Sequence, residues 1–455
     1  MEEDASIEDY QERKMLTETR SKLALEKLRH IRQCPQFTSR VRKLVVNAYA
    51  SGDGVFKRNT LIEALAFLPN LRMFIWHGKS PKLNADIIKL LAANCPALEE
   101  LSAPNSQPEL YRRRYNKHLP LSELHNLQSL SLIWQDTNSQ LAWWHLCWPI
   151  DPVQIHVQND FEIDDEVTEA VRLVMASNTE TLQKLTFSGP RIWHSPMPIF
   201  CNLAHLDLVD AGGWDKNNVV GWGDLGLILH HSIRLESLSI IIRRCDTNTL
   251  YPVFGSRPTA LLLLVFFKVL NNSETLHLEH ASSTSEFLRH KPWLQHIDLL
   301  IDVAWDGMLP VLLAIANLKS LEVLGLDVNG NTMDHLQLLE HSIPPRVSIL
   351  RLDTHFHGSP TLQDWLPLIK ERLQLSFFFS ANARCFGVSL EPEHFLTDPG
   401  SLVLVAVNDS LFDVIEPRDN GTYPGEWPKH KRSFLDVESI ENKDWKWLLC
   451  HHRLI

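Results

Sequence analysis

The residues best suited to metal chemistry lie in the segment DTHFHGSP, where Asp353, His355 and His357 occupy every second position. Alternate residues of a β-strand point to the same side, so the two imidazoles would lie next to each other. A zinc site needs further ligands, and the neighbouring sequence offers none. The C-terminal segment CHHRLI is a weaker candidate because chain ends are commonly frayed. We therefore predict no bound metal and no cofactor.

Motifs for catalysis and for phosphate binding are absent from the sequence. The glycine-rich segment 210–226 lacks both Gly-Lys-Ser/Thr and GxGxxG, and we interpret it as a loop between repeats. No GxSxG, HExxH or protein-kinase set occurs. The tryptophan-rich segment 141–148 has the spacing of a core-facing helix, with Trp143 on another face as a candidate contact residue. We predict that the protein is not an enzyme.

Composition and charge argue against other classes of protein. The 455 residues carry a net charge of −11, which argues against a general nucleic-acid-binding protein. The seven cysteines include no CxxC pair, a usage typical of buried thiols in a reducing compartment. The charged N-terminus lacks a signal-peptide core, and the most apolar run, 260–270, is too short to cross a bilayer. We expect a cytoplasmic or nuclear protein that binds neither nucleic acid nor membrane.

A leucine pattern recurs along the chain. LHNLQSLSL (124–132) spaces leucine by three, three and two positions, and LPNLRMFIW (68–76), CPALEELSA (95–103), FCNLAHLDL (200–208) and LKSLEVLGL (318–326) fit the same template. Neither a helix nor a strand has this spacing throughout. We assign the three-residue spacing to the chain that enters a repeat and the two-residue spacing to a short strand.

The penultimate apolar position of each copy serves as a marker for counting repeats. The mean spacing is about 28 residues, within the range of leucine-rich repeats. Two weak copies, at 155 and 375, fill gaps of twice the usual length. The predicted markers are Leu44, Phe74, Leu101, Leu130, Ile155, Leu185, Leu206, Leu238, Leu276, Ile297, Leu324, Leu350, Leu375 and Leu404.

Amphipathic segments between the markers predict helices, for example 84–95 and 164–175. Capping-box spacing at Thr60–Glu63 and Ser283–Glu286 predicts two helix starts. The step from marker 185 to marker 206 is too short and too proline-rich for a helix.

These features predict an α/β fold of the leucine-rich-repeat type. It is a solenoid, or horseshoe, of about fourteen irregular repeats, with parallel strands on the concave face and helices outside. One repeat buries too little to fold alone, so neighbours share a core and both ends need caps. We expect an N-terminal helical extension or cap at 1–33, the repeat domain at 34–415, and a C-terminal loop and capping helix at 416–455.

Residues between the inward positions of each strand point out of the concave face. Acidic and imidazole side chains concentrate in its central part, on strands about 4.8 Å apart. Solenoids commonly bind partners on this face. We predict a binding surface for a protein with basic side chains, the alternative being a merely solvated face, at His205, Asp207, His277, Glu279, His296, Asp298, Asp327, Arg351 and Asp353.

The segment LEKLRHIRQCPQFTSRVRKLVV, followed by this degenerate array, resembles the substrate-binding portion of fungal F-box/leucine-rich-repeat proteins. The likeness is carried by Leu28 to Leu44 and by the repeat length. No F-box is recognisable before residue 34, so 1–33 would be at most a remnant of one. The resemblance implies a substrate receptor of an F-box-type (SCF) ubiquitin ligase, with a protein substrate and a cullin-ligase adaptor as partners. The alternative is a structural or interaction scaffold without a ligase connection.

Overall fold

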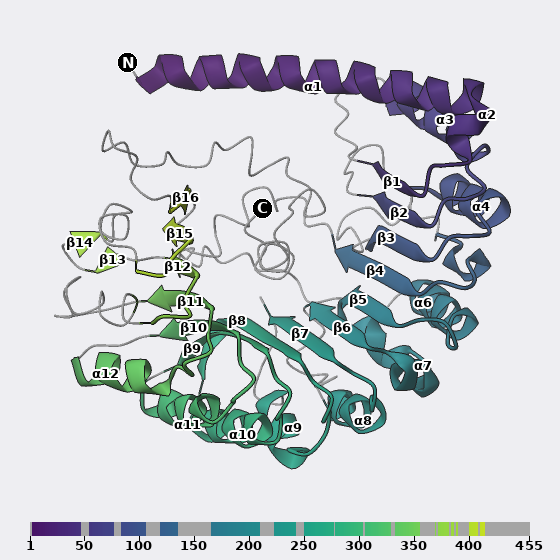
Figure 1. The fold of residues 1–455 in the computed structure, drawn as a ribbon. Coiled ribbons are helices and arrows are strands. Elements are labelled where there is room, and N and C mark those ends of the chain that lie inside the picture. Colours follow the sequence, from purple (N-terminus) through teal and green to yellow (C-terminus); the bar gives the residue numbers. More distant parts are fainter. Residues whose placement is uncertain are drawn as a thin grey trace, which may run out of the picture. The chain divides into compact units, whose positions relative to one another are not determined.

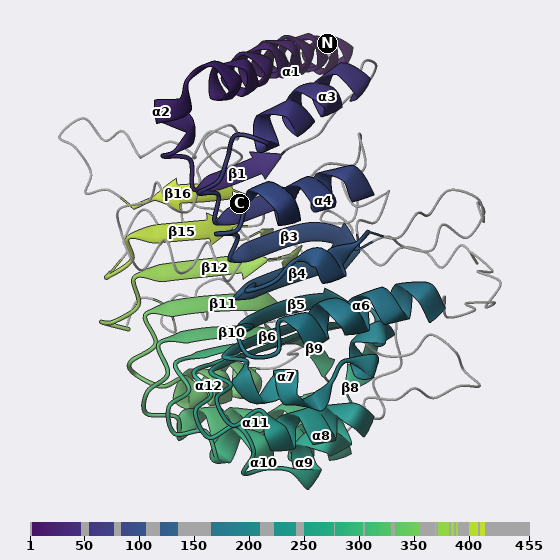
Figure 2. The same ribbon diagram turned by 90° about the vertical axis from the view of Figure 1, so that its right-hand side faces the viewer.

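The computed structural model divides the chain into two compact units, Met1–Ala211 and Gly212–Ile455, called here the first and the second unit. Each unit repeats one motif, a short strand and a connection that usually contains a helix (Figures 1 and 2). The structure describes residues 2–46, 54–76, 83–105, 119–134, 165–209, 223–242, 250–276, 278–303, 305–328, 333–354, 369, 372–381, 384–385, 388–389, 400–407 and 410–414.

The first unit is a layer of parallel strands with helices along one side of the layer (Figure 1). The strands follow one another in chain order: β1 (Lys43–Val46), β2 (Met73–Trp76), β3 (Glu100–Asn105), β4 (Ser129–Trp134), β5 (Lys184–Ser188) and β6 (His205–Val209). The register aligns one predicted marker from each strand: Leu44, Phe74, Leu101, Leu130, Leu185 and Leu206. From Phe74 onward these side chains are fully buried.

The connections of the first unit are mostly helical. They contain α1 (Glu2–Gln33), α2 (Pro35–Thr38), α3 (Gly54–Leu65), α4 (Ala85–Asn94), the 3₁₀ turn η1 (Leu121–Glu123), α6 (Asp165–Ser177), the 3₁₀ turn η2 (Pro190–His194) and α7 (Met197–Asn202). Asn84 caps α4, because its side-chain oxygen accepts a hydrogen bond from the Ile87 amide at 3.0 Å. α1 packs against α3, and Arg32 forms an ion pair with Glu63 between them.

A buried asparagine joins two successive repeats of the first unit. Asn178 follows α6 and is 1% exposed. Its side-chain oxygen accepts from the Leu127 amide at 2.8 Å, and its side-chain nitrogen donates to the Leu124 carbonyl at 3.0 Å. Leu124 and Leu127 are the two template leucines before β4, so Asn178 satisfies the backbone of a turn that must itself be buried.

The second unit has the same construction. Its elements are α8 (Gly223–His231), β7 (Ser237–Ile242), α9 (Leu250–Ser256), β8 (Phe266–Leu276), α10 (Leu278–Arg289), β9 (His296–Val303), α11 (Trp305–Ala316), β10 (Val323–Val328), α12 (Met333–Ser342), β11 (Ile349–Thr354), β12 (Phe377–Ala381), β13 (Arg384–Cys385), β14 (Val388–Ser389), β15 (Leu404–Val407) and β16 (Ser410–Asp413). β7 to β12 and then β15 pair in parallel, whereas β16 is antiparallel to β15, and β13 and β14 form a separate small pair. Both units therefore have the leucine-rich-repeat architecture.

Several predicted markers of the second unit are wrong. The register aligns Leu238, Phe267, Ile297, Leu324, Leu350, Phe378 and Val405. The predicted Leu276 therefore lies nine positions too late, Leu375 belongs to the turn before its strand, and Leu404 points to the opposite face. Leu404 lies in a run of consecutive apolar residues, where period-two alternation does not tell the two faces apart. Leu276 and Leu375 lie in short segments that alternate apolar and polar residues as the second half of the template does.

Other expectations also need correction. The predicted marker Ile155 lies outside the described residues, and β4 pairs directly with β5, which leaves no place for a strand between them. The two capping-box sequences, Thr60–Glu63 and Ser283–Glu286, lie inside α3 and α10, because both helices begin earlier. The connection between β5 and β6 does contain a short α-helix, α7.

The predicted domain boundaries are only partly covered by the described residues. α1 occupies the segment for which a helical extension is predicted, and its role as a cap stays a prediction. Residues 416–455 lie outside the described part. Among the described helices, none combines the length and the apolar character that crossing a membrane requires.

Candidate functional site

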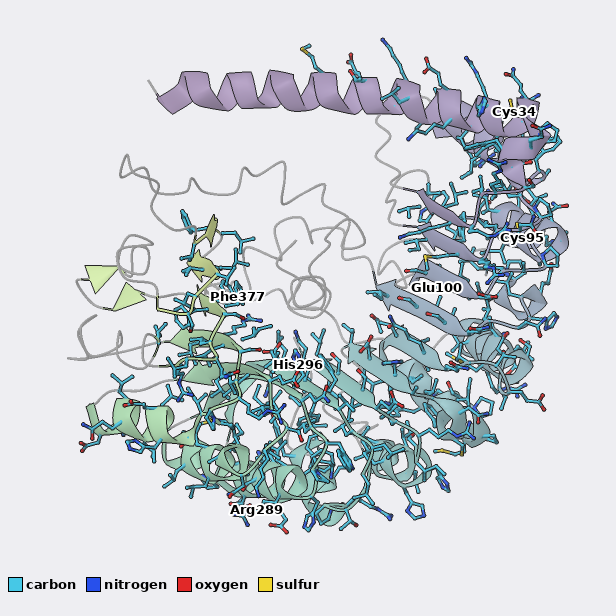
Figure 3. All side chains as sticks on the ribbon, in the orientation of Figure 1. Cys34, Cys95, Glu100, Arg289, His296 and Phe377 are labelled. Atoms are coloured by element: carbon cyan, nitrogen blue, oxygen red, sulfur yellow. The ribbon has the colours of Figure 1, made fainter. Side chains whose placement is uncertain are left out.

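The candidate site is the side of the strand layer that faces away from the helices, called here the strand face. It corresponds to the face that the sequence predicts to be concave. Marker residues point toward the helices, so the residues directly before and after each marker lie on the strand face. Figure 3 shows His296 and Phe377 at the strands of the second unit, with Arg289 on the helix side.

In the second unit, the positions before the markers form an apolar row. Val323, Ile349, Phe377 and Leu404 are paired across adjacent strands and are at most 4% exposed. Phe379, Ala406 and Leu411 extend the same buried cluster. The strand face of this unit is therefore largely apolar in β10, β11, β12, β15 and β16.

The positions after the markers form a charged row in the second unit. Lys268 on β8, Asp298 on β9, Gly325 on β10 and Arg351 on β11 share one register. Lys268 Nζ lies 2.8 Å from Asp298 Oδ2, and Arg351 Nη1 lies 3.8 Å from the same oxygen. The Asp298 carboxylate thus has one cation on each side, in an environment where an isolated charge would be costly.

Gly325 makes this arrangement possible. It lies between Asp298 and Arg351 in the register, and a Cβ at this position would stand 2.2 Å from Asp298 Oδ1. The missing side chain leaves the space in which the carboxylate extends toward β11. Arg351 in turn lies over the ring of Phe379 on β12, with its central carbon 5.3 Å from the ring centroid, a cation–π distance.

The central residues of the predicted binding surface are not accessible. Asp298 and His296 are 0% exposed, and Lys268 is 6% exposed. The His296 ring packs on Phe266 with centroids 4.1 Å apart. Both side chains are therefore buried, and the Asp298 carboxylate is matched by Lys268 and Arg351. The binding of a basic partner stays a prediction.

The remaining predicted residues are scattered. Asp327 and Asp353 are register neighbours on β10 and β11, next to the charged row. Glu279 lies in α10 instead of a strand, which corrects its predicted place, and His277 lies outside the described residues. His205 and Asp207 are on β6 in the first unit. Within the described ranges the structure brings Asp298 and Arg351 into contact, and Asp327 and Asp353 lie next to them in the register.

The strand face of the first unit differs because it remains partly open. Its row before the markers, in order from β1 to β6, is Lys43, Met73, Glu100, Ser129, Lys184 and His205, all partly or fully exposed. Its row after the markers is Val45, Ile75, Ser102, Ser131, Thr186 and Asp207, of which Thr186 is buried and donates to Asp207 Oδ2 at 2.9 Å. Figure 3 shows Glu100 at the strand layer of this unit.

The first-unit face changes character along its length. Val45, Met73 and Ile75 make β1 and β2 largely apolar beside Lys43, serines lie on β3 and β4 beside Glu100, and Lys184, His205 and Asp207 lie on β5 and β6. Val45 is 40% exposed although it is aliphatic. Such a surface can contact apolar, polar and charged groups of one partner in succession.

Sequence reasoning missed Lys268, the cation closest to Asp298. A signal was present, since Lys268 interrupts the apolar run 260–270 and a lysine there must reach a counter-charge or solvent. The misplaced marker at 276 concealed that Lys268 shares a row with Asp298.

No group of three or more potential metal-binding side chains occurs within the described ranges. Asp353 lies on β11, whereas His355 and His357 of the metal candidate are outside the described residues, as are Trp143 and the CHHRLI segment. The glycine-rich segment is described only from Gly223, where α8 begins. Burial raises the pKa of the Cys95 thiol to about 12, so this cysteine is not a nucleophile near neutral pH.

Comparison with known proteins gives little further information. No protein-family model matches the chain, and no curated protein sequence matches it. Among solved structures, the leucine-rich-repeat-containing protein LegL7 from Legionella pneumophila is similar over 72% of this chain and 97% of its own, with 12% sequence identity and a TM-score of 0.38. The assignment of the fold rests on the strand register and the buried marker positions.

Proposed function

We propose that this protein is a protein-binding leucine-rich-repeat module whose partner contacts the strand face of the first unit. The observation that carries the proposal is the contrast in exposure. The strand face of the first unit keeps exposed or half-exposed side chains on β1 to β6, whereas the corresponding rows on β8 to β12 of the second unit are largely buried. Solenoids use such faces for binding, and we propose the same non-catalytic role here.

The surface chemistry suggests the kind of partner. Val45, Met73 and Ile75 offer an apolar end, and Lys184, His205 and Asp207 offer a charged end about four strand spacings away. Serines between the two ends leave room for the partner's side chains. An extended protein segment with apolar residues at one end and charged residues at the other would match this order. The proposed preference for a basic partner then depends on Asp207 and Glu100.

The test compares two arginine substitutions in the full chain. Ser131→Arg puts a large charged side chain at the centre of the proposed face, and Ala93→Arg puts the same side chain on the exposed side of α4. Proteins captured from cell extract are identified by mass spectrometry for the wild type and for both variants. We expect a partner that is retained by Ala93→Arg and lost with Ser131→Arg. Equal capture by both variants would contradict the proposed surface.

The ligase role is a further proposal and rests on the F-box resemblance. A substrate receptor needs a second contact with a cullin-ligase adaptor, and the N-terminal segment is where the resemblance puts it. Met15 and Leu23 are exposed apolar residues of α1, at 69% and 50%. We expect co-purification of an adaptor that Leu23→Asp removes while the strand-face partner stays bound. A partner without any adaptor would favour the alternative, a scaffold.

A further inference from the structure

Exposed apolar side chains gather at one edge of the second unit, on the turns that lead into β7, β8 and β9. They are Ile233, Leu262, Leu263 and Trp293, with exposed fractions of 70%, 56%, 49% and 61%. The repeat does not require them, because the template positions of the same turns are filled by other, fully or almost fully buried leucines: Leu235, Leu264 and Leu294. The four exposed residues, Ile233, Leu262, Leu263 and Trp293, are called here the edge stripe.

Backbone hydrogen bonds show that the three turns stack in register. The Val265 amide donates to the Glu236 carbonyl at 2.8 Å, and the Gln295 amide donates to the Val265 carbonyl at 2.9 Å. These three residues therefore occupy equivalent positions. Ile233 and Arg234 lie three and two positions before Glu236. The corresponding pairs are Leu262 and Leu263 before Val265, and Pro292 and Trp293 before Gln295. Successive strands are about 4.8 Å apart, so the exposed apolar residues of the three turns form a continuous stripe.

The middle turn has an unusual backbone. Leu261, directly before the two exposed leucines, has a φ of 55° and is buried. This left-handed conformation is unfavourable for a residue with a Cβ, and such residues cluster at functional sites. The chain thus adopts a strained turn in which Leu261 and Leu264 are inside while Leu262 and Leu263 remain in contact with water.

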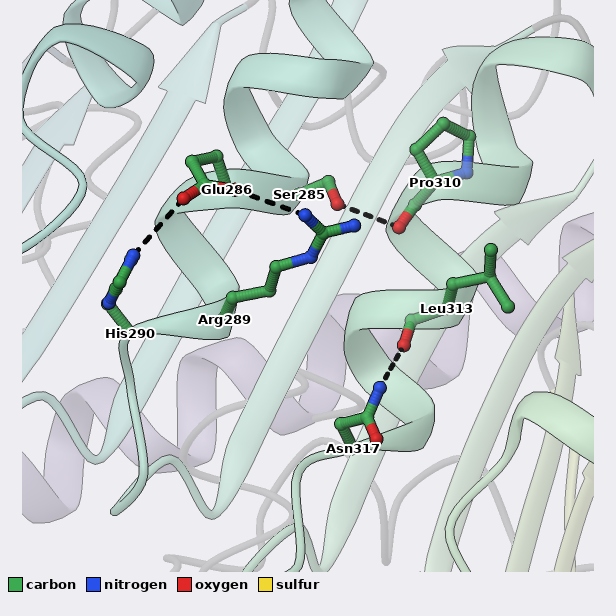
Figure 4. A network of polar contacts seen from close by, with 7 residues as sticks. All are labelled: Ser285, Glu286, Arg289, His290, Pro310, Leu313 and Asn317. Carbon is green, nitrogen blue, oxygen red and sulfur yellow. Dashed lines mark hydrogen bonds and ion pairs between the residues drawn. The ribbon is translucent and has the colours of Figure 1, made fainter.

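The rim of the edge stripe is predominantly basic. The C-terminal ends of α8, α9 and α10 lead into these turns and supply His230, His231, Arg257, Arg289 and His290. Figure 4 shows that Arg289 and His290 are matched by Glu286, at 3.1 and 3.2 Å.

Among the described residues, no acidic side chain forms an ion pair with the rim cations Arg234, Arg257 and Lys319. Arg257 contacts a ring nitrogen of His230 instead, and Arg234 is exposed on the turn before β7. Lys319 is exposed on the next turn beyond the stripe, before β10, where the acidic Glu322 is paired with Arg346 at 3.9 Å. Glu236 is the acidic residue within the stripe's own turns. An excess of positive charge around an apolar centre complements an acidic, apolar ligand.

We infer that the edge stripe is a second docking surface, which binds an acidic peptide segment of another protein through leucine or aromatic side chains. Trp293, on the turn before β9, is the main anchor, since exposed tryptophans with apolar neighbours and a charged rim are characteristic binding hot spots. Arg234, Arg257 and Lys319 orient the peptide through its carboxylates. This surface is independent of the strand face of the first unit.

Fluorescence anisotropy on the full chain tests the inference. The probe is a short fluorescein-labelled peptide in which leucine and phenylalanine alternate with aspartate, and the control peptide has lysine in place of aspartate. We expect saturable binding of the acidic peptide alone. Trp293→Ala and Arg234→Glu should each weaken it roughly tenfold or more. Leu373→Ala removes an exposed leucine, 87% exposed, from the equivalent turn before β12 and should have no effect.

Three outcomes would overturn the inference. They are no saturable binding of the acidic peptide, equal binding of the lysine peptide, and equal weakening by Leu373→Ala. Sedimentation tests whether a second copy of the chain binds the edge stripe, and flotation with anionic lipid vesicles tests whether a lipid surface does. If the acidic peptide does not bind, self-association that Trp293→Ala abolishes would assign the stripe to a second copy. Vesicle binding that the same variant abolishes would assign it to a lipid surface. Because every substituted residue is exposed, the variants should keep the wild-type melting temperature, and the strand-face partner should be captured as before.

Discussion

Gly325 and Asp298 form a matched pair on adjacent strands, in which the residue without a side chain provides the space for the carboxylate. A Cβ on Gly325 would stand 2.2 Å from Asp298 Oδ1 and 3.4 Å from its Cα. The carboxylate cannot move away freely, because it also binds Lys268 at 2.8 Å. The glycine is therefore required by a close approach and not by the backbone conformation.

The first prediction is that Gly325→Ala lowers the free energy of unfolding by about 1–3 kcal/mol, the usual cost of overpacking. Urea unfolding followed by circular dichroism measures the change. Gly226→Ala is the matched control: it lies in α8, where a Cβ would meet Val253 at an ordinary 3.7 Å, and alanine there should stabilise by up to about 1 kcal/mol. Equal effects at both glycines would contradict the proposed role of Gly325.

The second prediction concerns the charges of the same row. Asp298→Ala leaves Lys268 buried without its carboxylate and should cost about 3–5 kcal/mol. Lys268→Met should cost less, because Arg351 remains 3.8 Å from Asp298. In the double variant the cost should be smaller than the sum of the two single costs. Additive costs in this cycle, measured by urea unfolding, would show that the two side chains do not interact.

The repeat itself could be predicted from the sequence, and the chemistry of the strand face could not. Leu130, Leu206 and Leu324 are fully buried at equivalent positions because one apolar residue per repeat must fill a shared core. The template thus reports on the side of each strand that packs against the helices. The opposite side has no such periodic requirement, so its exposure depends on tertiary packing that a local pattern does not contain.

His296, Asp298 and Lys268 illustrate this limit. Histidine and aspartate next to a marker normally indicate a solvated face, yet both are fully buried here. The burial of Asp298 depends on Lys268 and Arg351, which come from strands 30 and 53 residues away in the chain. Only the correct marker in β8, Phe267 instead of Leu276, would have put Lys268 into the same row.

The third prediction tests the asparagine between two repeats of the first unit. Asn178→Ala leaves the buried Leu127 amide without its side-chain partner and leaves the Leu124 carbonyl with the 3.4 Å hydrogen bond from Ser177 Oγ, which should cost about 2–4 kcal/mol in total. Asn317→Ala is the control, since Asn317 makes one exposed hydrogen bond, to the Leu313 carbonyl at 2.8 Å (Figure 4). It should change the free energy of unfolding by less than about 1 kcal/mol. A similar loss at both positions would argue against a linking role for Asn178.

The fourth prediction is a pH dependence caused by Lys291, which occupies a position where the repeat template has leucine. The side chain is 0% exposed, its Nζ donates to the Pro258 carbonyl at 2.7 Å, and it lies 3.8 Å from the centroid of the Phe287 ring. Burial lowers the pKa of Lys291 from 10.5 to about 7. Between these two pH values the unfolded chain binds one more proton than the folded chain, so the free energy of unfolding rises with pH.

Lys291→Met should remove this pH dependence. We expect the wild type to gain stability relative to the variant by up to about 1.4 kcal/mol per pH unit between pH 7 and pH 10, and the difference to be constant below pH 7. Urea unfolding of both proteins at a series of pH values measures it. Lys319→Met removes an exposed lysine from the next repeat and serves as the control. An equal slope in that control, or a wild-type advantage that falls with rising pH, would contradict the assignment to the buried amine.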